Sequence, residues 1–195
     1  MRITNLISEN DDVIPVSVQS KRESSFFDVC SQCRGDCCRN ARPPLTLRRK
    51  QIIVAYLKEQ KIPIDSPFVQ TSYVFPKDDA EEYCIFYDKK TAKCLIHSVK
   101  PETCVAGPIT FDINIKNQKI EWHLKMEKIC PLAGVLYKNK DVLKKHLETA
   151  KREILTLVSE LDSEALKAIL KIEELETFKI GEDDIGKDIL DKLTK

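Results

Sequence analysis

The chain has 195 residues, of which 42% are hydrophobic and 32% are charged, and its formal net charge at neutral pH is +1. This size suits one domain, or one domain with an appendage. Because acidic and basic residues nearly balance, the composition argues against a bulk electrostatic attraction to nucleic acid or to a membrane surface.

The N-terminal segment, residues 1–25, is polar and weakly patterned, and we expect it to be an extension of the main domain. Four apolar residues in it suggest a short extended piece: Val13, Ile14, Val16 and Val18. The segment has no uninterrupted apolar run of signal-peptide length, and no part of the chain approaches the ~20 apolar residues that span a bilayer. The sequence therefore predicts a cytoplasmic protein without a membrane partner, in a reducing compartment where disulfides are rare.

A helix is predicted after the prolines at positions 43 and 44. Thr46 is a suitable N-cap residue, and apolar residues behind it recur at roughly helical spacing. These residues are Leu47, Ile53, Val54 and Leu57. Pro63 and Pro67 end this helix and mark a loop.

Residues 69–124 are predicted to form β structure interrupted by cysteines, and its clearest part is a hairpin. Apolar residues alternate with polar ones on both sides of a polar turn at residues 116–119, which is typical of two paired strands. The alternating residues are Ile109, Phe111, Ile113 and Ile115 before the turn and Ile120, Trp122 and Leu124 after it. One face of this hairpin should be buried.

From about Asp141 the pattern changes to that of helices. Apolar residues at three- to four-residue steps predict one long amphipathic helix, and Ser163 is a candidate cap of a second helix. Gly181 and Gly186 punctuate a short, acid-rich final segment. We expect residues 138–195 to form a helical extension that packs on the cysteine domain or mediates self-association.

All eight cysteines lie between residues 30 and 130. Four form the motif C-x-x-C-x-x-x-C-C and four are spread out: Cys30, Cys33, Cys37, Cys38, Cys84, Cys94, Cys104 and Cys130. Two residues between thiols let a tight turn present both sulfurs to one ion, and Gly35 supplies backbone freedom inside the loop. The preferred interpretation is therefore that these eight residues bind metal.

Three other interpretations compete with metal binding. Four disulfides conflict with the missing signal peptide. Buried free thiols are common as small hydrophobic residues, but clustered spacing is not typical of them. A redox relay built on Cys30 and Cys33 lacks a convincing βαβ pattern around its C-x-x-C motif.

The adjacent Cys37 and Cys38 bear on how many ions are bound. Neighbouring side chains diverge, so both sulfurs reach one tetrahedral ion only with strain. It is easier for them to serve different metals, or for one thiolate to bridge two. Eight thiols suffice for two four-sulfur sites, or for one iron–sulfur cluster with cysteines left for a second role.

These motifs resemble those of the YkgJ-type cysteine-cluster proteins, a family whose domain chelates zinc or iron. The run from Cys30 to Cys38 looks like the family's leading signature. The run C-x-x-H-x-x-K-P-x-x-C-x-x-x-P, from Cys94 to Pro108, is similar to a family pattern of Cys, Tyr, Arg-Pro, Cys and Pro. The segment from Cys84 to Asp88 and the pair Cys130-Pro131 look like its remaining elements.

The chain departs from the family pattern at three positions. His97 stands where Tyr is usual, Lys100 where Arg is usual, and Val105 where Arg commonly follows the cysteine. A lysine keeps the charge but loses the planar fork of arginine, which binds carboxylate or phosphate through two hydrogen bonds. His97 is a candidate extra ligand, although a substituted packing residue is the preferred interpretation.

Together, the residues and the resemblance predict an α+β chain. A small cysteine-rich metal-binding domain with a β-hairpin occupies residues 26–137 in this prediction, followed by the helical extension. The expected cofactor is zinc or iron, with a 4Fe–4S cluster as one form. A metal ion is the expected partner, a protein partner is left open, and no clear signal indicates nucleic-acid binding.

The predicted function is the chelation of zinc or iron, with an open physiological role. The alternative is an iron–sulfur-dependent enzyme, because the family's cysteine motif resembles that of the flagellin lysine N-methylases. That alternative lacks a Gly-rich nucleotide loop. It also lacks the radical S-adenosylmethionine order C-x-x-x-C-x-x-C. Whether the chain catalyses any reaction is not determined by its sequence.

Overall fold

The computed structural model describes residues 29–30, 33, 35–174 and 176–194, so the extended piece predicted around Val13 lies outside the described residues. The elements in chain order are η1 (Asp36–Cys38), α2 (Leu47–Glu59), β1 (Phe68–Gln70), β2 (Val74–Pro76), β3 (Tyr87–Asp88), β4 (Lys93–Cys94), η2 (His97–Val99), α3 (Glu102–Ala106), β5 (Ile109–Asn114), β6 (Lys119–Lys125), α4 (Pro131–Tyr137), α5 (Lys140–Glu160), α6 (Ser163–Ile169), β7 (Thr177–Asp184) and α7 (Lys187–Thr194).

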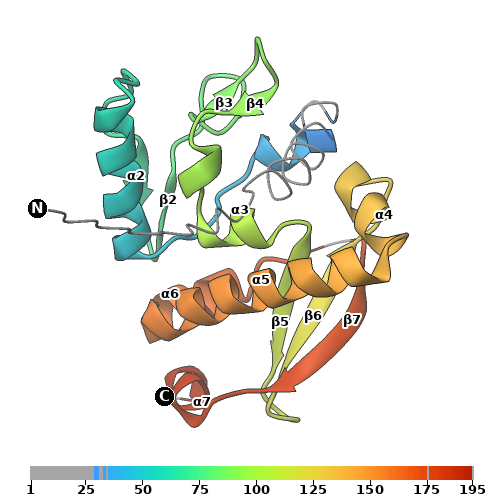
Figure 1. Cartoon of the computed structure of the whole chain (residues 1–195). Coiled ribbons are helices and arrows are strands. Elements are labelled where there is room, and N and C mark those ends of the chain that lie inside the picture. Colours follow the sequence, from blue (N-terminus) through green and yellow to red (C-terminus); the bar gives the residue numbers. More distant parts are fainter. Residues whose placement is uncertain (1–28, 31–32, 34, 175, 195) are drawn as a thin grey trace, which may run out of the picture.

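The predicted α+β fold class is confirmed. Helices combine with small antiparallel sheets, and the C-terminal region is mainly helical. In Figure 1 the long helix α5 runs across the three-stranded sheet, whereas α2 and the β3–β4 pair lie away from that sheet. Cys84 and Cys94 belong to this second part, whereas Cys130 packs against the core beside the three-stranded sheet.

The predicted hairpin is formed by β5 and β6. Ile109 lies opposite Leu124, and Ile113 lies opposite Ile120. All four side chains are buried, as the alternating pattern requires. Ile115 follows the last residue of β5 and is 46% exposed, so it belongs to the turn and not to the buried face.

A third strand, β7, was not predicted. It pairs antiparallel with β6 and gives the strand order β5-β6-β7. The acid-rich final segment hides this strand because β7 is an edge strand whose side chains are only partly buried, so apolar residues do not alternate strictly along it. The C-terminal region therefore contributes to the sheet as well as covering it.

Two clusters of buried side chains support the fold. The first lies between the sheet and the C-terminal helices and includes Trp122, Leu157 and Leu166, so it draws on both sides of residue 137. The second lies under α2 and consists of Leu45, Ile53, Leu57, Val74, Phe86 and Ile96. Cys84 and Cys94 pack against the second cluster, which gives the cysteine loops an apolar base of their own.

The predicted helix caps are partly confirmed. The Thr46 hydroxyl accepts a 3.0 Å hydrogen bond from the backbone N–H of Arg49, so Thr46 caps α2 as expected. Leu47 is 65% exposed and does not join the core. The prediction that Ser163 caps α6 was wrong by one residue, because the carboxylate of Asp162 accepts the capping bond from Ala165.

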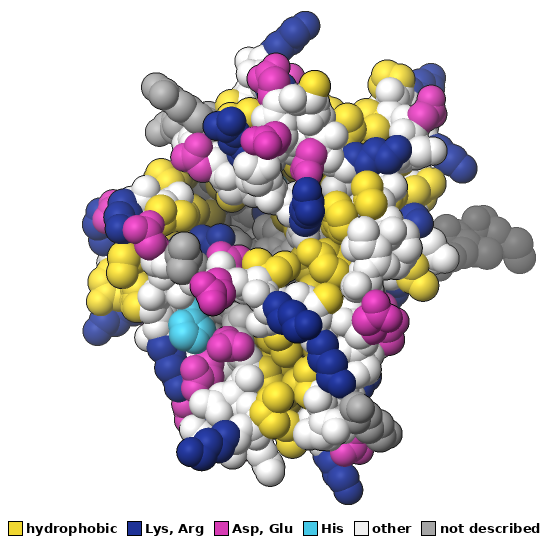
Figure 2. All heavy atoms as spheres, turned by 180° about the vertical axis from the view of Figure 1, so that it is seen from behind, with side chains coloured by type: hydrophobic (Ala, Val, Ile, Leu, Met, Phe, Trp, Pro, Cys, Tyr) yellow, Lys and Arg dark blue, Asp and Glu magenta, His cyan; other side chains and the backbone are white. Residues whose placement is uncertain are grey.

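The surface carries charges of both signs. Figure 2 shows lysine and arginine side chains interspersed with aspartate and glutamate over one face of the molecule, with hydrophobic patches between them. This distribution agrees with the near-zero net charge. Among the described helices, none combines the length and the apolar composition needed to cross a membrane.

Candidate metal centre

The leading cysteine motif folds into a tight loop around Gly35. The backbone N–H of Cys38 bonds to the carbonyl of Gly35 at 2.7 Å, which closes the short helix η1. Gly35 has a φ of 73°, and a Cβ added to it would lie 2.5 Å from Cζ of Tyr87. Both the left-handed conformation and the aromatic contact require glycine here, so this residue sets how Cys37 and Cys38 are presented.

Backbone pairing brings Cys38 beside Cys84. The N–H of Cys84 donates to the carbonyl of Cys38 at 2.8 Å, and Asn40 donates to Glu82 at 2.7 Å in the same stretch. The ring of Tyr83 stacks on that of Tyr87 with 5.2 Å between centroids. A thiol of the leading motif and one of the spread-out thiols thus lie on neighbouring backbones.

The remaining three cysteines reach the same region from separate elements. Cys94 lies in β4 opposite Tyr87 of β3, and Cys104 lies in α3. Cys130 precedes the first residue of α4 and donates its N–H to the carbonyl of Met126 at 3.0 Å. All eight cysteines are free thiols, so the disulfide interpretation is not supported. Cys37 is exposed and the other seven are half-buried.

The adjacent thiols of Cys37 and Cys38 act as a coupled pair. Their sulfur atoms lie 4.0 Å apart. The hydrogen bond between them lowers the pKa of Cys37 to about 6, and the charges of Lys125 and Lys100 act in the same direction. The same bond raises the pKa of Cys38. The two thiols therefore titrate as a pair, in which Cys37 loses its proton more readily than Cys38.

Cys38 interacts electrostatically with Cys84 and Cys104, and Cys94 interacts with both of these thiols. Burial raises the pKa of Cys84 to about 12, and the neighbouring thiol of Cys94 adds to this effect. Burial likewise raises the pKa of Cys104, and the thiols of Cys84 and Cys94 contribute. The charges of Cys104 and Cys84 in turn raise the pKa of Cys38. We call Cys38, Cys84, Cys94 and Cys104 the second set.

The other three thiols associate with Cys37. Burial raises the pKa of Cys30 to about 11, and the charges of Cys37, Cys33 and Cys130 add to it. Burial also raises the pKa of Cys130, again with contributions from Cys37 and Cys33. We call Cys30, Cys33, Cys37 and Cys130 the first set. Cys37 also affects Cys84, Cys94 and Cys104, so it lies where the two sets meet.

The donor chemistry fits zinc or iron. Thiolates are the preferred ligands of structural zinc and of iron–sulfur clusters. In the part of the chain that the structure describes, no three His, Cys, Asp or Glu side chains are grouped so that they could hold one ion. The raised pKa values also mean that a metal must displace protons from most of these thiols.

The three histidines lie outside this arrangement or at its rim. His97 is in η2 with an exposed side chain. His123 faces Glu121 at 3.7 Å. Nε2 of His146 lies 3.0 Å from the carbonyl of Ala106 and 3.1 Å from that of Gly107, so it connects α5 to the end of α3. These contacts indicate structural roles for His123 and His146.

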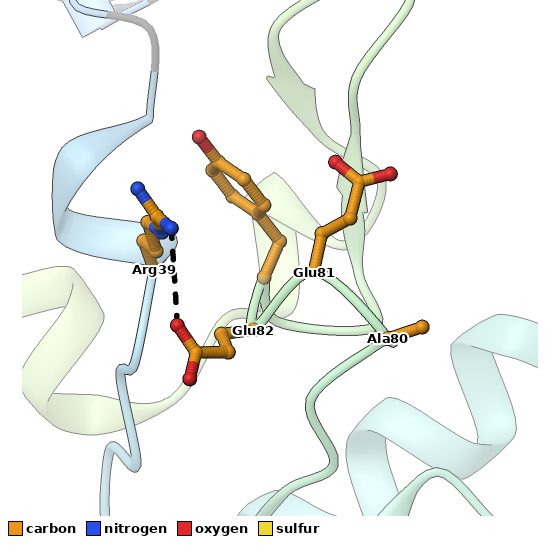
Figure 3. A pocket seen from close by; sticks show the side chains of 5 residues that line it. Arg39, Ala80, Glu81 and Glu82 are labelled. Atoms are coloured by element: carbon orange, nitrogen blue, oxygen red, sulfur yellow. Dashed lines mark ion pairs between the residues drawn. The ribbon is translucent and has the colours of Figure 1, made fainter.

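An open hollow of about 420 Å³ lies beside the backbone bridge between Arg39 and Tyr83. Figure 3 shows its lining residues, Arg39, Ala80, Glu81, Glu82 and Tyr83. Arg39 and Glu82 form an ion pair at 3.8 Å, and both side chains are more than half exposed. None of the lining residues is a cysteine, so this hollow is separate from the thiols.

Free thiols on η1, β4, α3 and the neighbouring loops, in the spacing C-x-x-C-x-x-x-C-C followed by four separate cysteines, are typical of a cysteine-rich, metal-chelating class of domain. Residues 29–131, just over half of the chain, match the family described as "CxxCxxCC: Putative zinc- or iron-chelating domain", and the chain belongs to this family.

A curated relative comes from an archaeon. Over 113 residues the chain is 32% identical to the uncharacterized protein MJ0661 of Methanocaldococcus jannaschii, and the alignment covers 51% of this chain and 58% of that protein. The chain thus spans little more than half the length of this relative. No solved structure matches the chain.

Proposed function

We propose that the protein binds zinc or iron through its eight cysteines, arranged as two sets that meet at Cys37 and Cys38. The observation that carries this proposal is the position of Cys37. Its sulfur lies 4.0 Å from that of Cys38, and its charge acts on thiols of both sets. Two adjacent cysteines whose side chains diverge at such a position can bind two different ions, or one of their thiolates can bridge both ions.

The chain's own residues supply both the ligands and the compensating charge. The first set and the second set would each offer four sulfurs. A bound ion would supply the positive charge that keeps these thiols deprotonated. Lys100 contributes in the same direction, because its charge lowers the pKa values of Cys30, Cys37, Cys94 and Cys104.

Zinc and iron bound by the same sulfur ligands differ in their visible absorbance. A tetrathiolate zinc site is colourless and closed, whereas a 4Fe–4S cluster absorbs visible light and is also held by four thiolates. The iron–sulfur enzyme alternative follows from the sequence resemblance alone, and no contact described above supports it.

The test is metal analysis of the full chain purified anaerobically from cells supplied with both zinc and iron. We expect stoichiometric zinc or iron, and in the iron case visible absorbance. Cys130→Ser removes a sulfur from the first set and Cys104→Ser one from the second, so each should lower the metal content or weaken the binding of one ion. Ser98→Ala, an exposed change in η2, is the control and should retain wild-type content.

Two results would overturn the proposal. The first is a wild-type protein that holds neither metal above trace and does not take up zinc after full reduction. The second is a pair of serine variants with wild-type stoichiometry and affinity. If only one of the two serine variants lost metal, the protein would still be a metal-binding protein, but the proposal of two equivalent sets would be rejected.

A further inference from the structure

Glu102 is a buried carboxylate two residues before Cys104. It is 2% exposed, and Thr46 beside it is 3% exposed. Among the residues that the structure describes, these two are the buried polar side chains. The Thr46 hydroxyl donates to Oε1 of Glu102 at 2.7 Å. A buried carboxylate is unfavourable unless it is paired, so the surroundings of Glu102 need an explanation.

Arg49 supplies the opposite charge and connects three elements. Its Nε lies 3.5 Å from Oε1 of Glu102, and its side chain is 18% exposed. Its Nη1 group donates to the carbonyl of Lys100 at 3.1 Å. Its Nη2 group donates to Glu153 of α5 at 2.5 Å. One guanidinium from α2 thus holds both ends of the segment 100–102 and joins it to α5.

The network of Arg49, Glu102 and Thr46 is not well explained by a contribution to stability alone. Oε2 of Glu102 is buried and has no hydrogen-bond partner among the described residues. Removing a carboxylate and a guanidinium from water costs free energy that their attraction offsets only with complete hydrogen bonding. A well-packed apolar pair would stabilise the same contact at least as well. The network is therefore better explained by what it fixes in place.

The segment that the network fixes carries half of the second set. Cys94 precedes Lys100, Cys104 follows Glu102, and the charge of Lys100 acts on both thiols. A shift of this segment would move Cys94 and Cys104 relative to Cys38 and Cys84. The contacts of Arg49 and Glu102 with α2 and α5 oppose such a shift.

We propose that Arg49, Glu102 and Thr46 are positioning residues that hold the Cys94–Cys104 segment in the geometry that the second set needs to bind metal. This inference rests on the proposed metal-binding function. Residues that support metal ligands without touching the ion commonly change affinity by about 10- to 100-fold when they are replaced.

The test measures metal affinity of the full chain by chelator competition, with Co²⁺ as a spectroscopic probe of ligand geometry. Glu102→Gln removes the charge at constant shape. Arg49→Lys keeps the charge, but a single ammonium cannot reproduce the three contacts of the fork. We expect both variants to bind their weakest metal about 10- to 100-fold less tightly. Their Co²⁺ spectra should also change, which a purely structural role would not cause.

Glu82→Gln is the matched control. Glu82 also stands two residues before a cysteine, Cys84, and also pairs with an arginine. That pair is 3.8 Å long and both side chains are more than half exposed. Figure 3 draws it as a dashed line between Arg39 and Glu82. We expect its affinity and spectrum to match the wild type, because exposed ion pairs contribute little.

A second pair of variants applies if the charged substitutions impair folding. Thr46→Ser keeps the hydroxyl that donates a hydrogen bond to Glu102, whereas Thr46→Val removes it. Only the valine variant should therefore bind metal less tightly. Folded variants with wild-type affinity and spectra would overturn the positioning role while metal binding stands. A wild type that binds no metal would instead reject both proposals.

Discussion

The backbone N–H of Cys84 donates a 2.8 Å hydrogen bond to the carbonyl oxygen of Cys38. The bond joins the leading motif to the spread-out cysteines through main-chain atoms that need no ion. Metal binding would then require side-chain adjustment and not the assembly of distant segments. A partly preorganised site of this kind lowers the conformational entropy that binding must overcome.

Cys37 should be the most reactive thiol of the reduced, metal-free protein. It is the exposed cysteine, and its hydrogen bond with Cys38 lowers its pKa to about 6, so it is largely thiolate at neutral pH. We expect iodoacetamide to modify Cys37 several-fold faster than Cys104, measured by peptide mass spectrometry. Prior addition of zinc should protect it. Equal labelling of all eight residues would contradict this prediction.

Gly35→Ala should weaken metal binding and destabilise the cysteine loop. The added methyl group meets the ring of Tyr87 at 2.5 Å, and the φ of 73° disfavours any residue with a Cβ. We expect a loss of stability of about 1–3 kcal/mol, measured by denaturant unfolding.

Gly134→Ala is the matched control for the Gly35 variant. The atoms nearest to its added methyl group belong to the side chain of Glu127, which can move because it is 61% exposed. Alanine also has the higher helix propensity, so this variant should be neutral or slightly more stable. Equal losses from both variants would contradict the role given to Gly35.

Removal of metal by a chelator should open the cysteine loops but spare the hairpin. If residues 26–137 were a single domain held together by metal, as the sequence predicts, they would unfold together. The structure instead places β5 and β6 in the first core cluster with α5, away from the second cluster. We expect hydrogen exchange to rise at residues 35–42 and 78–104 and to change little at 109–125. Uniform loss of protection over both regions would show that metal holds the whole domain together.

His146 should make stability fall on mild acidification. Burial lowers its pKa below the ordinary value, because its ring is enclosed and faces the positive charge of Lys100. An unfolded histidine takes up a proton near about pH 6.5, whereas the folded one does so only at lower pH. The unfolded state therefore binds more protons in this window, and stability decreases as the pH falls through it.

His146→Gln tests this linkage. The glutamine amide can donate to the carbonyls of Ala106 and Gly107 but does not titrate. Denaturation midpoints measured between about pH 5 and 7, with chelator present, should therefore depend less on pH in the variant. Parallel profiles of wild type and variant would contradict the assignment.

Asp183→Ala should destabilise the sheet. The indole N–H of the buried Trp122 donates to Asp183 at 2.6 Å, and Lys151 lies 2.9 Å from the same carboxylate oxygen. Losing the acceptor leaves the indole N–H without a hydrogen-bond partner, which should lower the stability by about 1–3 kcal/mol. Urea unfolding followed by the fluorescence of Trp122, the single tryptophan, measures this loss.

Asp184→Ala is the control for the Asp183 variant. Its side chain is 89% exposed and pairs with Lys119 at the surface. Its replacement should change stability by less than about 0.5 kcal/mol, as for exposed ion pairs in general. A variant at 184 as unstable as that at 183 would remove the special role of the indole contact.

Local patterns in the sequence predicted the elements whose cause is local. Thr46 caps α2 because a hydroxyl before an amphipathic run satisfies a free backbone N–H. The alternation around Trp122 predicted the hairpin, because strand side chains point to opposite faces in turn. In both cases the residues that signal the structure lie within it.

Features that depend on distant contacts were not predictable. The β7 strand forms because β6 offers an edge, and Gly181 opposite Trp122 carries no sign of that pairing in its own neighbourhood. Spacing also indicated eight metal-binding thiols without assigning them to sets, since the assignment follows from folding. Nothing in the sequence singled out Glu102, because no periodicity marks a single buried charge whose partner lies in another helix.

The first core cluster has a consequence for any shorter version of the chain. A fragment ending at residue 131 would retain every cysteine and the whole family match, yet it would lack β7 and the helices that cover Trp122. Its β6 would expose an open edge, which is a template for joining strands of other molecules. We expect such a fragment to aggregate and become insoluble, although its thiols would still be able to react.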